Sequence, residues 1–119
     1  MTGFRALLLV LLLAVVIYTL PVIANHGLNL FAVFFGDIGT MAWPGQFNMD
    51  FLGFLTLSAV WMAWRNQFTG AGLGPAVLAF FGGIPVLTTY LLVESSRVNG
   101  HVGELLLGRE RFQTLSQLT

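Results

Sequence analysis

The chain has 119 residues, of which 56% are hydrophobic and 8% are charged, and its formal net charge is zero. Soluble domains are about a quarter charged, so these charges are too few to cover a water-facing surface. The lack of a basic patch excludes a nucleic-acid partner, and the lack of cysteine excludes disulfides and thiolate chemistry. The composition predicts an all-α integral membrane protein.

Three apolar runs, 6–24, 47–64 and 74–93, are the predicted membrane spans, because a helix needs about 20 apolar residues to cross the bilayer core. The first run is uncharged throughout. In the second, only 14 residues lie between Asp50 and Arg65, about 21 Å of helix. The span must therefore extend back past Asp50, which draws this carboxylate about one turn into the membrane. Trp61 and Trp64 beside Arg65 are typical of a membrane interface.

In the third run, Pro75 suits a first helical turn and Pro85 lies mid-span. Proline removes a backbone donor, so we expect one helix with a kink, closed by Glu94. Together the three spans form a predicted transmembrane domain, 1–95. A polar, amphipathic tail, 96–119, follows it, with a short helix lying on the membrane surface.

The positive-inside rule places Arg5 and the 65–72 turn in the cytoplasm. The first loop and the tail then lie outside, although Arg97, Arg109 and Arg111 in the tail oppose this orientation. A basic set made only of arginine suggests a GC-rich bacterial source, hence the bacterial inner membrane. The alternative for the first run is a signal peptide that is cleaved after Val22-Ile23-Ala24.

The long first loop contains a second apolar feature. Leu28 to Phe35 is almost continuously apolar but too short to span, as is typical of an interfacial segment. The following 36–46 stretch holds three Gly and one Pro and is predicted to be an irregular cap on the membrane.

Asp50 is the leading functional candidate, because an ionisable group at membrane depth is costly. It shares a helix face with Phe54, Leu57 and Trp61. One interpretation is a proton or cation site, or an anchor for an arginine of a partner. The other is a cap at the start of the second span.

His26 follows the first span and is a possible ligand for a metal or pigment, but it has no second ligand four residues away. We therefore expect no metal and no cofactor. Small residues predict helix packing: Ala59 with Ala63 on the second span, and Ala79 with Gly83 on the third.

Three segments resemble the small three-span bacterial membrane proteins of domain of unknown function 2834. They are NHGLNLFAVFF after span one, FNMDFLGFLTLSAVWMAW at span two, and AVLAFFGGIPVLTTYLL at span three. The resemblance covers roughly residues 4 to 95, and the 36–46 stretch departs from the usual pattern. It implies the three-span architecture and brings no established activity.

The expected function is therefore that of a non-enzymatic accessory or structural subunit. Its partners are the lipid bilayer and either other membrane-protein subunits or further copies of this chain. Two alternatives remain: a pigment- or small-ligand-binding module that uses His26, and an ion- or proton-coupled carrier that acts as an oligomer through Asp50.

Overall fold

The computed structural model describes residues 1–118, and within them it contains seven helices and no strand. The all-helical class is thus confirmed. The helices are α1 (Thr2–His26), α2 (Leu30–Gly39), α3 (Trp43–Arg65), α4 (Gly70–Gly82), α5 (Ile84–Arg97), α6 (Val102–Leu107) and α7 (Arg109–Leu118).

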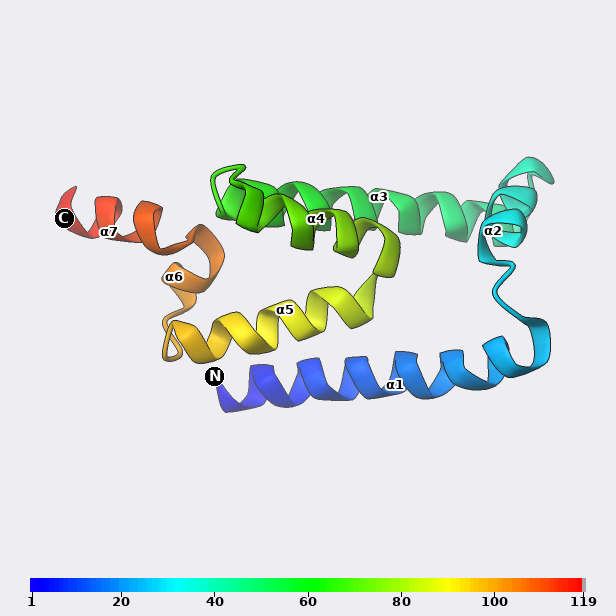
Figure 1. The fold of residues 1–119 in the computed structure, drawn as a ribbon, viewed down its shortest axis with the longest axis horizontal. Helices are drawn as coiled ribbons and strands as arrows, with labels where there is room; N and C mark the ends of the chain where they lie inside the picture. The colour runs from blue at the N-terminus through cyan, green and yellow to red at the C-terminus, as the bar shows by residue number, and fades with distance from the viewer. Residues whose placement is uncertain (119) are drawn as a thin grey trace.

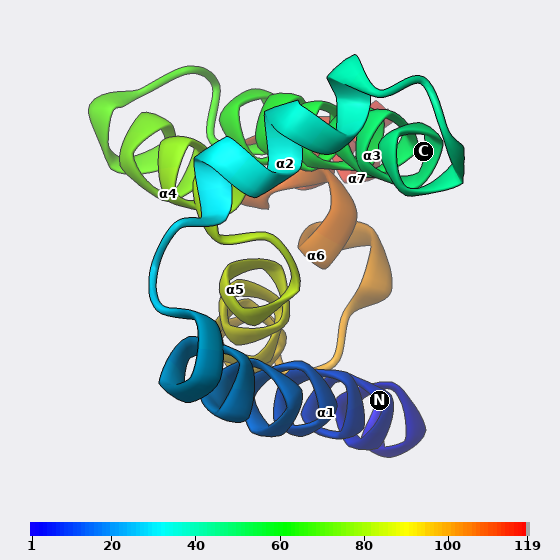
Figure 2. The ribbon, with the colours of Figure 1, turned by 90° about the vertical axis from the view of Figure 1, so that its right-hand side faces the viewer.

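The long helices lie side by side along the 52 Å axis of the molecule (Figure 1). α5 packs on α1 and α4 packs on α3, so the bundle has two layers, with α5 facing the second layer (Figure 2). α2 packs against the first turns of α3 at one end of the bundle, and α6 and α7 lie at the other end.

The buried core lies between α3 and α4. Met62 and Ala63 of α3 meet Ala76 and Ala79 of α4, and Ala59 packs against their edge. Small side chains let the two helix backbones approach closely. Ala59, Ala63 and Ala79, which the sequence singled out for packing, all lie in this contact.

The predicted third span is two helices in the structure, because the chain reverses at Gly83. Gly83 has φ +67° and ψ −139°, a backbone conformation that side-chain-bearing residues rarely adopt. Pro85, expected as a mid-span kink, instead lies in the first turn of α5, where its missing N–H costs nothing. The expectation of one kinked helix over 74–93 is therefore corrected to a helical hairpin.

Contacts with α3 establish the direction of each arm of the hairpin. Gly72, at the start of α4, abuts Asn66 just beyond the end of α3, whereas Gly83 lies near Phe51 in the middle of α3. α5 then returns, and its Glu94 reaches Arg65. With 13 and 14 residues, the arms are about 20 Å long, shorter than the roughly 30 Å core of a bilayer.

As a consequence, both termini lie at the same end of the bundle (Figure 1). Arg5 Nη2 donates a hydrogen bond of 2.5 Å to Ser96 Oγ, which ties the start of α1 to the end of α5. The sequence-based expectation placed the tail at the end opposite the N-terminus. The hairpin accounts for this difference, because α4 and α5 together bring the chain back to where it started.

Among the described residues, α1 alone is both long and apolar enough to qualify as a membrane span. Its 25 residues contain a window of mean hydropathy 2.9, of which 6% is buried. α3 has 23 residues, but Gln46, Asn48 and Asp50 make its first turns polar. α4 and α5 are too short. A single apolar helix near the N-terminus is also what a signal sequence looks like.

The surface of residues 1–118 is rich in apolar side chains: 36 large ones are exposed, whereas eight apolar side chains are buried. They occur on every helix from α1 to α5, including Leu13, Tyr18, Phe54 and Leu78, each more than half exposed. Soluble monomers rarely expose contiguous apolar surface on this scale. The bundle therefore presents a broad apolar surface along α1 to α5, which we call the apolar belt.

We predict that Gly83→Ala destabilises the hairpin by about 1–3 kcal/mol, because a side-chain-bearing residue is strained at this positive φ. The added Cβ would also lie 3.1 Å from Phe51 Cζ. Unfolding of the detergent-purified protein by sodium dodecyl sulfate, followed by circular dichroism, measures the change. The control is Gly53→Ala in α3, where the new methyl meets open space and stability should rise slightly. Equal stability of the two variants would contradict the strained turn.

Candidate functional site

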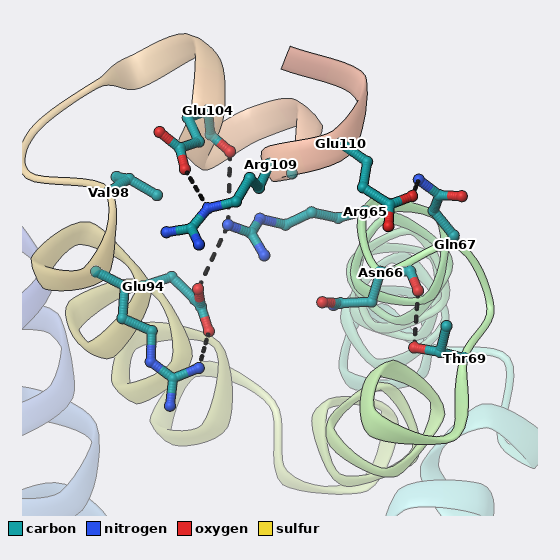
Figure 3. A pocket seen from close by; sticks show the side chains of 11 residues that line it. Arg65, Asn66, Gln67, Thr69, Glu94, Val98, Glu104, Arg109 and Glu110 are labelled. Carbon is teal, nitrogen blue, oxygen red and sulfur yellow. Dashed lines mark hydrogen bonds and ion pairs between the residues drawn. The ribbon is translucent and has the colours of Figure 1, made fainter. Parts of the chain in front are cut away.

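The most developed polar site surrounds Arg65, the last residue of α3, which is only 7% exposed. Its guanidinium points between α5 and α6 (Figure 3). Nη2 lies 3.4 Å from Glu94 Oε2, and Nη1 donates a 3.0 Å hydrogen bond to the Tyr90 hydroxyl. Asn66 also donates to that hydroxyl, at 2.8 Å. Arg65 therefore connects the end of α3 to the last two turns of α5.

The same guanidinium binds the end of α6. Nε donates to the Leu105 carbonyl at 2.5 Å, and Nη2 lies 3.5 Å from the Glu104 carbonyl. Trp61 Nε1 donates to the next carbonyl, that of Leu106, at 3.0 Å. The last four carbonyls of a helix have no intrahelical donor, and a cation is favourable at this end of the helix dipole. Side chains of α3 thus cap α6.

Gly108 permits this contact between the tail and α3. It has φ +85°, and a Cβ there would collide with the Arg65 carbonyl. Glycine is therefore required both for the backbone conformation and for the close approach. The chain can pass directly over the end of α3 and begin α7.

Three residues of α7, Arg109, Glu110 and Arg111, make further polar contacts. The Arg111 guanidinium lies 4.0 Å from the centre of the Trp64 ring and donates to the Trp64 carbonyl. Gln67 donates to Glu110 at 2.6 Å. Arg109 and Glu104, 3.2 Å apart, form an ion pair between the two tail helices.

Between these groups lies an open hollow of about 420 Å³, which contains three arginines and three glutamates. Each glutamate contacts a donor (Figure 3). Glu94 forms ion pairs with Arg65 and Arg97, and Glu104 forms one with Arg109. Glu110 accepts a hydrogen bond from Gln67. The three arginines and three glutamates neutralise one another, and their contacts join α3 and α5 to the tail. The cluster therefore holds the tail on the bundle.

The structure places Asp50 seven residues inside α3, exposed on its surface. α3 begins at Trp43, with Ala42 as its N-cap, which excludes the interpretation of Asp50 as a cap. Within residues 1–118, its carboxylate has no hydrogen bond or ion pair. It borders an open hollow of about 440 Å³ whose other walls are mainly apolar, among them Ile38, Met41 and Met49.

His26 is the last residue of α1 and is exposed. The other histidine, His101, precedes α6 at the opposite end of the bundle (Figure 1), where its Nδ1 lies 2.9 Å from the Val98 carbonyl. Within residues 1–118, no three His, Asp or Glu side chains gather where they could hold a metal ion. The two histidines therefore cannot share a ligand.

The charges are separated along the bundle. All five arginines of the sequence lie at one end, which we call the arginine end; they are Arg5, Arg65, Arg97, Arg109 and Arg111. With three glutamates, this end has a net charge of +2. Asp37 and Asp50, on α2 and the first turns of α3, give the opposite end, the aspartate end, a net charge of −2.

Sequence reasoning did not find the Arg65 site. It treated Arg65 as a residue of the membrane interface and Glu94 as the end of the third span, whereas the structure brings the two together. The 3.4 Å pair of Glu94 with Arg97 is a further part of the cluster. The available signal was an isolated arginine beside two tryptophans, with a glutamate-containing tail downstream. This signal identifies the site only if the chain is known to reverse at Gly83, because the reversal brings Glu94 and the tail to Arg65.

Comparison of this chain with protein-family models, with curated proteins and with solved structures finds no match. The resemblance to domain of unknown function 2834 stays a prediction.

We predict that Arg65→Gln destabilises the protein by about 3 kcal/mol, because it removes a buried cation and leaves Glu94 with the exposed Arg97 alone. It also removes two donors to the end of α6, so the tail should detach. Limited proteolysis should then cut the 98–101 segment faster. Arg65→Lys should restore only part of the loss, because an ammonium lacks the planar fork of donors.

The matched control is Arg109→Gln, which removes an ion pair whose arginine side chain is 70% exposed. Exposed pairs contribute about 0–1 kcal/mol, so stability and cleavage should stay near the unmodified protein. If Arg65→Gln behaves like this control, the tail is not held by Arg65.

Proposed function

We propose that this chain is a non-enzymatic integral membrane protein that serves as an accessory or structural subunit packed against another membrane protein. The observation that carries the proposal is the apolar belt along α1 to α5, which ends at the polar cap that the Arg65 cluster forms with α6 and α7. Lipid or the helices of other membrane proteins would cover such a belt, whereas water would not.

In the proposed topology, α1 and α3 cross the membrane and the α4–α5 hairpin enters from the arginine end and returns to it. Short helical arms of this kind are tolerated at membrane depth where they are buried in protein. α5 meets this condition, because it lies between α1 and the other layer (Figure 2). Since all five arginines lie at one end, the positive-inside rule places that end, with both termini, in the cytoplasm.

This topology removes the conflict that the three-span arrangement left. The tail arginines opposed the orientation indicated by Arg5 and Arg65 when the tail was assigned to the outside. With a hairpin in place of the third span, all five favour the same orientation. The contact of Arg5 with Ser96 and the packing of α1 on α5 also support retention of α1 rather than its cleavage.

An accessory role fits the way the polar groups are used. The Arg65 cluster forms internal ties between α3, α5 and the tail helices, and its carboxylates are already bound to donors. Among the described residues, 36 large apolar side chains are exposed and only eight apolar side chains are buried. A subunit of this kind would contribute its surface to a larger assembly.

Cysteine labelling tests the topology, because the natural chain has no cysteine and each variant carries a single thiol. We expect Thr40→Cys, in the loop after α2, to react with an impermeant maleimide in intact bacterial cells. Thr69→Cys, in the α3–α4 turn, and Thr114→Cys, in α7, should react only after the membrane is opened. Labelling of Thr114→Cys from outside would restore the three-span arrangement and overturn the hairpin topology.

Purification tests the accessory role. The chain should resist extraction by alkaline carbonate and should leave native membranes in mild detergent as part of a defined larger complex of constant composition. Extraction by carbonate would contradict membrane integration. A small, colourless species without partners would contradict the accessory role, and a visible absorption band in that fraction would favour the pigment-binding alternative.

A further inference from the structure

We infer that the Asp50 face of α3 is a docking surface for a transmembrane helix of a different membrane protein, one that presents an arginine or lysine at the depth of Asp50. This inference rests on the proposed accessory function and names the kind of partner. Three observations carry it: an unpaired carboxylate, a regular stripe of bulky apolar side chains around it, and the separation of charge along the bundle.

The carboxylate lies at membrane depth in the proposed topology. Asp50 is 15 residues from Arg65, which corresponds to about 22 Å along α3. With Arg65 at the boundary of a core roughly 30 Å thick, Asp50 lies about 8 Å inside the opposite boundary. A carboxylate exposed to hydrocarbon there is costly, and a cation at the same depth would offset that cost.

The surroundings of Asp50 fit a helix rather than a small ion. Positions spaced alternately four and three residues apart on this face carry bulky side chains, and the apolar ones are 64–72% exposed. These positions are Trp43, Phe47, Asp50, Phe54 and Leu57. The 4-3 repeat is the pattern by which two helices pack side by side at a small crossing angle.

The side of α3 opposite Asp50 is already occupied. Gly45, Leu55 and Ala63, on the opposite side, are buried, and Asn48 on that side donates to the Phe34 carbonyl of α2 at 3.1 Å. Toward the arginine end, Trp61 and Trp64 are engaged by the tail. The open part of the face is therefore the length from Trp43 to Leu57, centred on Asp50.

A second copy of this chain does not supply the cation. Copies inserted in the same orientation place Asp50 beside Asp50, because all five arginines lie at the arginine end. Like charges at one depth oppose association. The charge that complements Asp50 must therefore come from a different chain.

The test uses synthetic transmembrane peptides and the whole protein, reconstituted together in neutral phosphatidylcholine vesicles. One Leu/Ala peptide carries a single arginine about five residues from one end, and a second carries leucine there. Binding is followed by energy transfer from a label on Thr40→Cys. We expect the arginine peptide to bind at least tenfold more tightly than the leucine peptide, and Asp50→Asn to abolish this preference.

Two variants sharpen the result. Asp50→Arg should reverse the preference, so that a peptide with glutamate at the same position binds more tightly than the arginine peptide. Asp37→Asn, which removes the other carboxylate of the aspartate end, should leave the preference for arginine unchanged. A change in this variant as large as in Asp50→Asn would point to general charge attraction and would overturn the inference.

Equal binding of all peptides would mean that the face is covered by lipid. Self-association of the protein that requires Asp50 would mean that a second copy occupies it. Either result overturns the docking inference while carbonate resistance and the cysteine pattern still support the membrane topology. Failure of those two measurements would instead remove the proposed function on which the inference rests.

Discussion

The reversal at Gly83 determines where every charged residue in the second half of the chain lies. Because the backbone there adopts φ +67°, α4 ends and α5 returns along the bundle instead of continuing away from it. Had the helix continued, Glu94 and the tail would lie at the aspartate end, remote from Arg65. The polar cap, the position of the C-terminus and the separation of charge all depend on this one turn.

The buried Arg65 depends on this reversal and in turn holds the returning chain in place. A cation that is 7% exposed needs acceptors from several elements, and the reversal brings α5 and α6 to it together. In return, Arg65 holds α5, the returning arm of the hairpin, through Tyr90 and Glu94, and fixes the tail through the carbonyls of α6. A compact cap therefore closes an otherwise apolar bundle that buries few large side chains.

The sequence was sufficient for features that depend on local composition. The all-helical class, α1, the apolar character of α3 and the packing positions Ala59, Ala63 and Ala79 could all be read from apolar runs and spacing. The hairpin could not, because hydropathy is summed along the chain and is the same whether a helix continues or turns back. From the sequence, the irregularity in the third span was assigned to Pro85. The stronger signal of a break was the Gly82-Gly83 pair that precedes it. The Arg65 site was out of reach for the same reason, since its partners lie 25 to 40 residues away.

Arg65 and Asp50 lie on the same helix, but Arg65 is buried and Asp50 is exposed. Arg65 is surrounded by acceptors from its own chain, so its charge is satisfied by folding. Asp50 lies where the chain supplies no cation, on the side of α3 that the core does not use. The fold therefore buries one charge among acceptors and leaves the other exposed on an apolar surface. At the arginine end, the electrostatic requirements of the buried charge are met by the chain itself. At the other end, the carboxylate of Asp50 has no cation within residues 1–118, and in the proposed topology a neighbouring helix would provide one.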